Sequence, residues 1–179
     1  MALRPPDQVD GDGIRLRRMS ARDAADIAVA VAASGPELRR YETWAEDGFT
    51  AADGLAYVVW WERAWEEGTA FYYAIEGEDG TFYGSAGLGQ VDHESGSSAV
   101  GYWIRSDAAG RGIATAALRA LVAAAHAAGF VELTAVIAES NLASRRVAEK
   151  AGGVRREPFG GIVPADGGPV PAVEYVLEG

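Results

Sequence analysis

Hydrophobic and polar positions in the first third of the chain follow a strand pattern and then a helical one. Residues 13–19 alternate between apolar and mostly basic side chains, as in a short strand. Ser20-Ala-Arg-Asp23 has the capping-box pattern of a helix start, and we expect this helix to stop at Gly35-Pro36. A second helix start at Thr50–Asp53 leads into apolar residues at helical spacing that end at Gly68. The pattern therefore predicts one strand followed by two helices.

The rest of the chain is predicted to supply most of a sheet. Its strand-like segments are rich in aromatic or β-branched residues and are separated by turn residues; they are 69–75, 82–91, 99–105, 131–138, 154–163 and 170–177. An alanine-rich helix from about Arg111 to Ala128 lies between the third and fourth of these, and such a crossover joins parallel neighbours. We expect an α/β (α+β) fold with a single mixed, mostly antiparallel sheet of six to seven strands flanked by about four helices.

Composition limits the class of protein. The chain has 179 residues, of which 49% are hydrophobic, and five tryptophans, so we expect one folded domain over 1–179. No apolar run approaches the roughly 18 residues of a membrane span, and the N-terminus has no hydrophobic signal core, so we expect a cytoplasmic protein without a membrane partner. The chain has no cysteine and only His93 and His126 as histidines. We therefore expect no disulfide, no cysteine nucleophile and no metal site.

The net charge of the chain limits the classes of partner that we expect it to bind. With 16 basic and 26 acidic residues, the net charge is −10. This charge disfavours nucleic acid as a partner and favours a cationic one. An acidic surface that only keeps the protein dissolved explains the charge equally well.

The segment Ala108–Thr115 carries the clearest functional pattern. It joins a predicted strand to the alanine-rich helix and contains Gly110 and Gly112. Such glycines let backbone N–H groups approach a ligand, and a helix N-terminus favours a phosphate. A dinucleotide fingerprint does not fit, because its last glycine would fall on Thr115, and a P-loop does not fit, because the only lysine is Lys150. The alternative is a glycine-rich turn that caps an ordinary helix.

The elements around this segment have a characteristic order. Asn141 follows Gly112 by 29 positions and opens a polar segment after the predicted strand 131–138. This order resembles the GCN5-related N-acetyltransferase (GNAT) superfamily, and within it the RimJ/RimL-like ribosomal-protein alanine N-acetyltransferases, over roughly Phe71 to Phe159. The resemblance implies a GNAT fold with a splayed central parallel pair of strands, and acetyl-coenzyme A (acetyl-CoA) as co-substrate.

The resemblance also implies which residues bind acetyl-CoA. In the family, backbone amides in a Gln/Arg-x-x-Gly-x-Gly/Ala pattern bind the pyrophosphate, and residues 109–114 fill it with Ala109 at the first position. Asn141 is expected to bind the pantetheine arm, although Asn-x-x-Ser is also a common helix cap. The expected contacts are Trp103, Ile104, Arg105, Ala109, Gly110, Arg111, Gly112, Ile113, Ala114, Thr115, Asn141 and Ser144.

The general acid is expected to be a serine. Many relatives carry a tyrosine seven positions after the asparagine, where this chain has Ala148. Ser144 resembles the general acid proposed for RimL-like members. A thiolate leaving group needs little help, so a hydroxyl or water suffices.

The general base is not fixed by spacing. Family members often carry a glutamate just before the equivalent of Gly101-Tyr102-Trp103, where this chain has Ala99-Val100. We take His93 and Glu94 as catalytic candidates, since an imidazole with a pKa near 6.5 suits proton removal at neutral pH. Further candidates that remain open are Asp92, Glu42, Glu157 and Glu174.

The missing base favours an acceptor amine that is already partly neutral. At pH 7 an α-amine is neutral in roughly one molecule in seven and a lysine in about one in 2,500. The resemblance implies the α-amine of a protein N-terminus, acetylated by direct attack in a ternary complex, with the oxyanion held by a main-chain N–H near Tyr102–Ile104. A basic N-terminal segment would suit the acidic chain. We expect Tyr41, Trp44 and Tyr102 to bind this acceptor.

Two other functions remain open. One is acetylation of a small-molecule amine such as an antibiotic, a polyamine or an amino acid. The other is a non-catalytic acyl-CoA-binding module, since Ala99 and Ala148 stand where relatives carry catalytic groups. Relatives are often dimers, which implies a homodimer.

Overall fold

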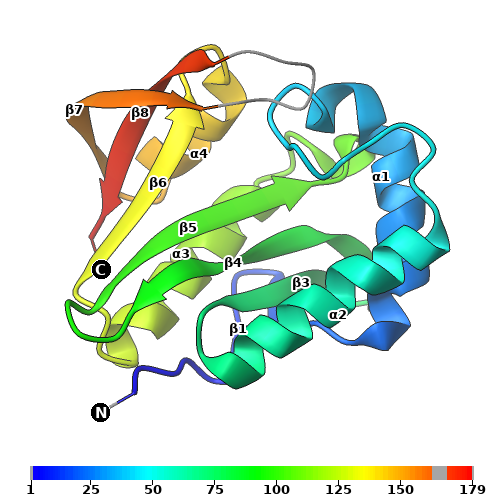
Figure 1. Ribbon diagram of the computed structural model, residues 1–179, viewed down its shortest axis with the longest axis horizontal. Helices are drawn as coiled ribbons and strands as arrows, with labels where there is room; N and C mark the ends of the chain where they lie inside the picture. The colour runs from blue at the N-terminus through cyan, green and yellow to red at the C-terminus, as the bar shows by residue number, and fades with distance from the viewer. Residues whose placement is uncertain (1, 163–168, 179) are drawn as a thin grey trace.

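The computed structural model describes residues 2–162 and 169–178, which form one mixed sheet with helices on both faces (Figure 1). The strands are β1 (Gln8–Asp10), β2 (Ile14–Arg18), β3 (Phe71–Gly77), β4 (Phe82–Asp92), β5 (Ser97–Ile104), β6 (Glu132–Ala138), β7 (Gly153–Ile162) and β8 (Val170–Leu177). The helices are α1 (Ala24–Leu38), α2 (Ala51–Glu67), α3 (Ile113–Ala127) and α4 (Leu142–Lys150). The expected mixed α/β architecture is confirmed.

The strand order in the sheet is β1-β2-β3-β4-β5-β6-β8-β7, and β5 with β6 is the parallel pair among the described strands. Within the described residues the sheet has eight strands, one more than the upper expectation. The additional strand is β1, whose three residues are too short to show a period of two. It pairs with β2 at the edge of the sheet.

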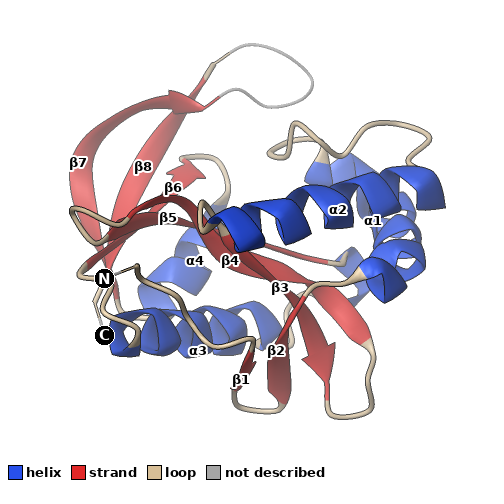
Figure 2. Cartoon of the chain, turned by 60° about the horizontal axis from the view of Figure 1, so that its bottom comes forward, coloured by secondary structure: helices blue, strands red, loops and turns tan. Residues whose placement is uncertain are grey.

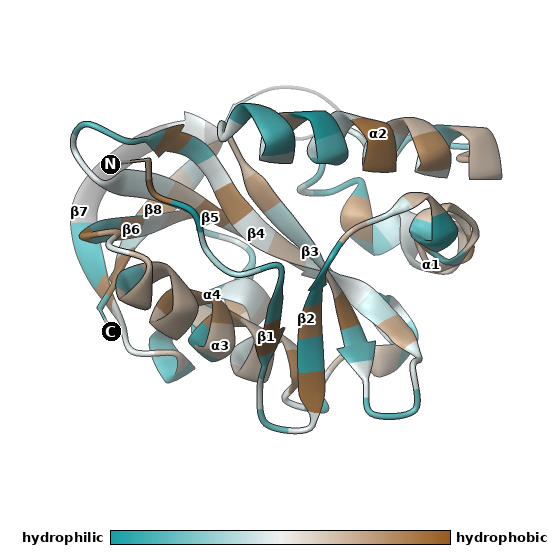
Figure 3. Cartoon of the chain, turned by 90° about the horizontal axis from the view of Figure 1, so that it is seen from below, coloured by the Kyte–Doolittle hydropathy of each residue, from teal (hydrophilic) through white to brown (hydrophobic). Residues whose placement is uncertain are grey.

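Helices α1 and α2 lie on one side of the sheet, and α3 and α4 lie on the other (Figure 2). The stripe on α3 that includes Ala117, Leu118 and Leu121 is fully buried against the sheet. Along β2, apolar and basic positions alternate, and Figure 3 shows this alternation on the strand. Ile14 and Leu16 are the buried members. The sequence pattern thus predicts the inward faces of these two elements correctly.

Helix α1 does not stop at Gly35-Pro36 but continues to Leu38, which corrects the expected end. Proline removes one helical hydrogen bond, yet it stands in the last turn, and Arg39 N–H still donates to the carbonyl oxygen of Gly35 at 3.0 Å. Leu38 is only 7% exposed and belongs to the core between α1, α2 and the sheet. Burial of this side chain favours the extra turn.

The parallel pair separates along its length. β5 and β6 are in register only from Ser97 with Glu132 to Ala99 with Thr134. Beyond this point β5 stays with β4, whereas β6 continues with β8, and the two strands diverge in Figure 1. Residues 100–104 therefore have no ladder partner on the β6 side, and their backbone is available to a ligand. This is the splayed pair that the resemblance implies.

Candidate active site

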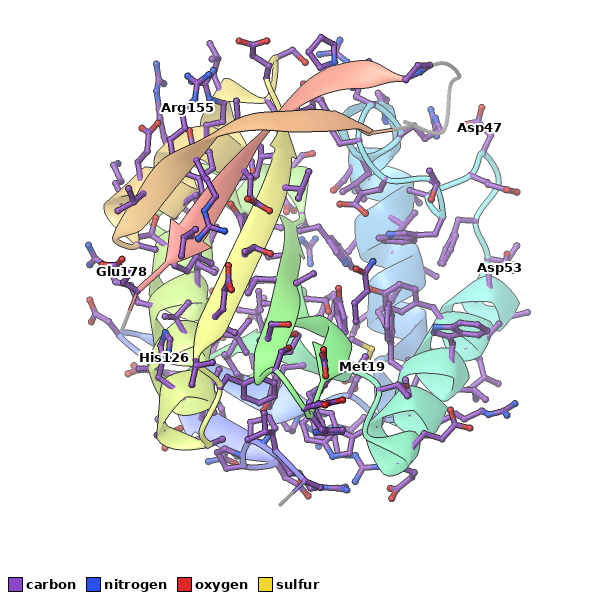
Figure 4. The ribbon with its side chains drawn as sticks, turned by 60° about the vertical axis from the view of Figure 1, so that its left-hand side comes forward. Met19, Asp47, Asp53, His126, Arg155 and Glu178 are labelled. Carbon is purple, nitrogen blue, oxygen red and sulfur yellow. The ribbon has the colours of Figure 1, made fainter. Side chains whose placement is uncertain are left out.

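A groove of about 830 Å³ begins where β5 and β6 diverge. It is lined by the end of α1, the segment between α1 and α2, the end of β5, the loop that leads into α3, the first turn of α3 and the length of α4. In Figure 4, Asp47 of the segment between α1 and α2 and Arg155 of β7 lie on opposite sides of β5 and β6. The groove thus combines segments that are far apart in the sequence.

The loop before α3 has the geometry of an anion site. Gly110 and Gly112 have φ angles of 77° and 82°, which L side chains rarely adopt. A Cβ atom at either position would meet no atom within 4 Å, so the space beside this backbone is open. Gly112 caps α3, and the first turn of the helix holds no acidic residue. The first N–H groups of α3 lack helical partners and carry the positive end of the helix dipole. The loop can therefore bind a phosphate or pyrophosphate through its backbone.

At the start of α4, the hydroxyl groups of Ser144 and Tyr102 meet across the gap that opens where β5 and β6 diverge. Asn141 Oδ1 accepts a hydrogen bond from Ser144 N–H at 3.1 Å, which caps the helix. The hydroxyl oxygens of Ser144 and Tyr102 lie 2.8 Å apart, and the Tyr102 hydroxyl also donates to the Ser144 carbonyl at 2.9 Å. Burial raises the pKa of Tyr102 to about 12, so the phenol stays protonated. Asn141 thus has the capping role that its sequence pattern allows.

Glu42 lies on the other wall of the groove, in the segment between α1 and α2. Trp44 Nε1 donates to Glu42 Oε2 at 2.8 Å. Burial raises the pKa of this carboxyl to about 7, and the Trp44 hydrogen bond opposes the shift. A carboxyl with this pKa can take up and release a proton near neutral pH.

Aromatic rings pack behind this wall. The ring of Trp44 lies 4.7 Å from that of Tyr57 and 5.5 Å from that of Trp103, measured between centroids. Next to them, Trp61 stacks on Tyr72 at 3.8 Å. Trp103 lines the groove, whereas Trp44 supports it from behind.

Most of the residues predicted for the site meet in this groove. They are Tyr41, Tyr102, Trp103, Ile104, Ala109, Gly110, Gly112, Ile113, Ala114, Thr115, Asn141 and Ser144. Five predicted residues do not line it: Trp44, Arg105, Arg111, His93 and Glu94. The guanidinium of Arg105 pairs with Asp107, and that of Arg111 lies 5.3 Å above the ring of Tyr83.

The structure does not bring His93 and Glu94 to the groove. Both lie in the turn after β4, where Asp92 is paired with Ser97. This turn is about 16 Å along β5 from Tyr102, at about 3.3 Å per residue. His93 Nδ1 accepts from Leu3 N–H at 3.2 Å, and its Nε2 lies 3.0 Å from the Gly68 carbonyl oxygen. An antiparallel hairpin places its turn at the end opposite to the loop before α3, which is why these two residues are separated from Ser144.

The other open candidates for the base differ in position. Asp92 lies in the same distant turn and accepts hydrogen bonds from Glu94 N–H and Ser95 N–H. Glu174 lies 3.8 Å from Arg156 on the β7–β8 hairpin. The side chain of Glu157 lies outside the described part of the chain. Among the candidates whose side chains the structure describes, Glu42 is the one that lines the groove.

Sequence reasoning missed part of the lining. The missed residues are Glu37, Leu38, Ser106, Ser140, Leu142, Ala143, Arg146, Val147 and Lys150. Arg146 and Lys150 had a usable signal, because they lie four positions apart on the helix that begins after Asn141 and therefore share a face. Glu37 had none, because its place in the groove depends on how α1 packs.

Neither a metal centre nor a membrane-spanning helix is found among the described residues. Across residues 2–162 and 169–178, there is no cluster of three or more histidines or carboxylates that could hold a metal ion. In the same residues, no helix is long and apolar enough to cross a membrane.

Solved structures with the same arrangement of elements include several acetyltransferases. RimJ of Mycobacterium smegmatis, in complex with CoA-disulfide, has a TM-score of 0.89 and 24% identity, over 97% of this chain and 89% of that chain. The ribosomal L7/L12 alpha-N-protein acetyltransferase RimL, in complex with coenzyme A, has a TM-score of 0.85 and 17% identity, over 92% and 93%. The microcin C7 self-immunity acetyltransferase MccE, in complex with acetyl-CoA and AMP, has a TM-score of 0.86 and 16% identity, over 92% of each chain.

No curated protein matches the sequence of this chain. The pattern of the Acetyltransferase (GNAT) domain matches residues 14–154, which include the split strands, the glycine loop and Ser144. With most of the chain matched and the fold in agreement, the chain belongs to the GNAT family of acetyltransferases.

Proposed function

We propose that this acetyltransferase transfers the acetyl group of acetyl-CoA to the α-amine of a protein N-terminus. The observation that carries the proposal is the single groove that joins an anion-binding loop, an unpaired strand edge and the Ser144–Tyr102 hydroxyl pair. RimL, whose structure has a TM-score of 0.85 with this chain, is a ribosomal L7/L12 alpha-N-protein acetyltransferase, which supports this class of acceptor.

The residues of the groove fit two parts of acetyl-CoA, the pyrophosphate and the pantetheine arm. The backbone of residues 109–114 would hold the pyrophosphate, since both glycines leave their N–H groups accessible. Arg146 and Lys150 line the same groove and add positive charge near the phosphates. The free edge of β5 would pair with the amide groups of the pantetheine arm.

The reacting groups would lie near Tyr102. A backbone N–H of residues 102–104 would stabilise the oxyanion of the thioester carbonyl, as the resemblance implies. Ser144 would give its proton to the departing thiolate, and the Tyr102 hydroxyl at 2.8 Å would orient it. Acetyl-CoA supplies the thioester; the chain supplies position, hydrogen bonds and proton transfer.

The charge of the protein supports a cationic acceptor. The net charge is −10, and Glu37 and Glu42 line the groove on the side of the segment between α1 and α2. A basic N-terminal segment would be attracted there. A ribosomal-protein acceptor would place the reaction in the cytoplasm. The homodimer expected from the resemblance stays a prediction.

A small-molecule amine is the second candidate acceptor. Tyr41, a half-buried residue of the groove lining, offers an aromatic ring against which a planar group could stack. MccE, whose structure holds AMP beside acetyl-CoA, gives this candidate its support.

Acetyl transfer to a panel of acceptors tests the proposal. The panel contains basic peptides with a free N-terminus, the same peptides with a blocked N-terminus and a free lysine, and small amines including polyamines and aminoacyl nucleotides. We expect mass spectrometry to find acetyl groups on the free α-amines only. Modification of small amines alone would replace the proposal with the second candidate. Tight binding of coenzyme A without turnover of any amine would leave a non-catalytic module.

A further inference from the structure

Among the described residues, the carboxylates of Glu37 and Glu42 line the groove. They differ in burial and in the hydrogen bonds that they accept. Glu37 is exposed at the end of α1, where the Ser106 hydroxyl donates to it at 3.3 Å. Glu42 is partly buried, and Trp44 Nε1 donates to its Oε2 at 2.8 Å. Each carboxylate thus accepts one hydrogen bond from the protein, but only that of Glu42 lies in a surrounding that limits its solvation.

The anchor of Glu42 is itself fixed. The indole of Trp44 packs against Phe49, Tyr57 and Trp103 at centroid distances of 5.9, 4.7 and 5.5 Å. Such a packed indole has little freedom to move, so Glu42 Oε2 is held in place. Glu42 Oε1 has no hydrogen-bond partner among the described residues and is the oxygen left to meet an incoming donor.

We propose that Glu42 is the general base of the acetyl transfer and accepts the proton of the acceptor ammonium on Oε1. The inference rests on the proposed acetyl transfer to an amine, but it holds for a peptide and for a small amine alike. Glu42 and the Tyr102–Ser144 pair lie on opposite walls of one groove, so the acceptor nitrogen can stand between its base and the thioester.

The proton balance of the step is as follows. The ammonium gives one proton to the Glu42 carboxylate, and the neutral nitrogen forms a C–N bond to the thioester carbonyl carbon. The C–S bond then breaks, and Ser144 gives its hydroxyl proton to the thiolate. The second proton that the nitrogen loses replaces the proton on Ser144, and Glu42 releases its own to water. The products are the amide, the thiol of coenzyme A and one proton.

Of the titratable groups around the groove at this point, the Glu42 carboxyl is the one suited to accept a proton near neutral pH. Tyr57 of α2 and Tyr72 of β3 are close enough to interact with its charge, and burial raises the pKa of both phenols, that of Tyr57 to about 12. Across the groove are Tyr102, whose pKa burial also raises to about 12, and the cations Arg146 and Lys150. The three phenols therefore stay neutral while the carboxyl, whose pKa lies near 7, titrates.

The test compares Glu42→Gln with Glu46→Gln in the full chain. Glu46 is an exposed carboxylate of the same segment that does not line the groove, so it controls for charge and for the segment itself. With whichever amine the acceptor panel identifies, we expect Glu42→Gln to lower kcat/KM about 100-fold and Glu46→Gln to leave it within about twofold. The affinity for coenzyme A should be unchanged in both variants.

Two further readouts separate a base from a structural residue. The acidic limb of the pH profile of kcat/KM should have an inflection near pH 7 in the wild type. In Glu42→Gln it should move up to the pKa of the free α-amine, about 7.8, because this variant can use only the neutral amine. An acceptor that carries a hydrazide in place of the amine is neutral at pH 7, so its loss of rate in Glu42→Gln should be below about tenfold.

The outcomes distinguish this inference from the proposed function. Equal pH profiles in the wild type and Glu42→Gln, or equal losses with the amine and the hydrazide, would overturn the role of Glu42. Turnover of small amines alone would overturn the peptide acceptor and still test Glu42 with those amines. No turnover of any amine by the wild type would overturn both.

Discussion

The hydroxyl groups of Tyr102 and Ser144 lie 2.8 Å apart, although the two residues are 42 positions apart in the chain. Tyr102 comes from β5 and Ser144 from the first turn of α4, so the contact spans the split between β5 and β6. The Tyr102 hydroxyl also donates to the Ser144 carbonyl at 2.9 Å. This pair fixes the position of a serine hydroxyl at the side of the groove where the thiolate would leave.

Tyr102→Phe and Ser144→Ala should therefore act on the same step. We expect Ser144→Ala to lower kcat about 10-fold to 100-fold and Tyr102→Phe about fivefold to tenfold, because the phenol acts through the serine. The double variant should be no slower than Ser144→Ala. Tyr73→Phe is the control, since the buried Tyr73 hydroxyl donates to the Pro6 carbonyl away from the groove. Additive losses in the double variant would contradict the coupling.

Gly112→Val should remove coenzyme A binding. A valine at φ 82° is strained, and its side chain would cover the N–H groups of the loop. Gly80→Val is the matched control, because Gly80 has φ 81° in the β3–β4 turn and is also free of neighbours within 4 Å. Both variants should lose about 1–3 kcal/mol of the free energy of unfolding. Titration calorimetry should show at least a 100-fold loss of affinity for Gly112→Val alone; equal affinities in the two variants would refute the anion site.

Arg146→Gln and Lys150→Gln should weaken coenzyme A binding through charge. Both cations line the groove near the start of α3, so each should contribute about threefold to tenfold in affinity at low salt. The difference from the wild type should shrink as salt is added. Arg63→Gln on α2 is the control, because Arg63 pairs with Glu67 on the protein surface. A salt-independent loss would point to a change in the fold of α4 instead.

The stability of the ligand-free protein should depend on Glu42. Its pKa is raised to about 7 in the folded state, so the folded state holds this proton more tightly than the unfolded chain. The resulting stabilisation is present below about pH 4.5 and is lost as the pH rises through about 7, by about 1–3 kcal/mol. Glu42→Gln should remove this part of the slope, and Glu46→Gln should keep it. Urea unfolding at pH 5 and pH 8 measures the difference, and parallel slopes in all three proteins would contradict the burial of this carboxyl.

The sequence by itself determined the elements and the donor side of the site. The period of α3, the alternation along β2, and the glycines at 110 and 112 are local signals, and each element follows from its own residues. The order of these elements also identified the family, which the match over residues 14–154 supports. A glycine loop before a helix is readable without a structure because its ligand groups are backbone atoms of adjacent residues.

Only the tertiary structure decided which side chains meet in the groove. His93 and Glu94 were favoured as bases by their residue types, but the antiparallel hairpin places them at the far end of β5. Glu42 was one carboxylate among several until the packing of Trp44 against Tyr57 and Trp103 placed and buried it. Burial and long-range contact depend on how helices pack on the sheet, and neither is encoded in the spacing of neighbouring residues.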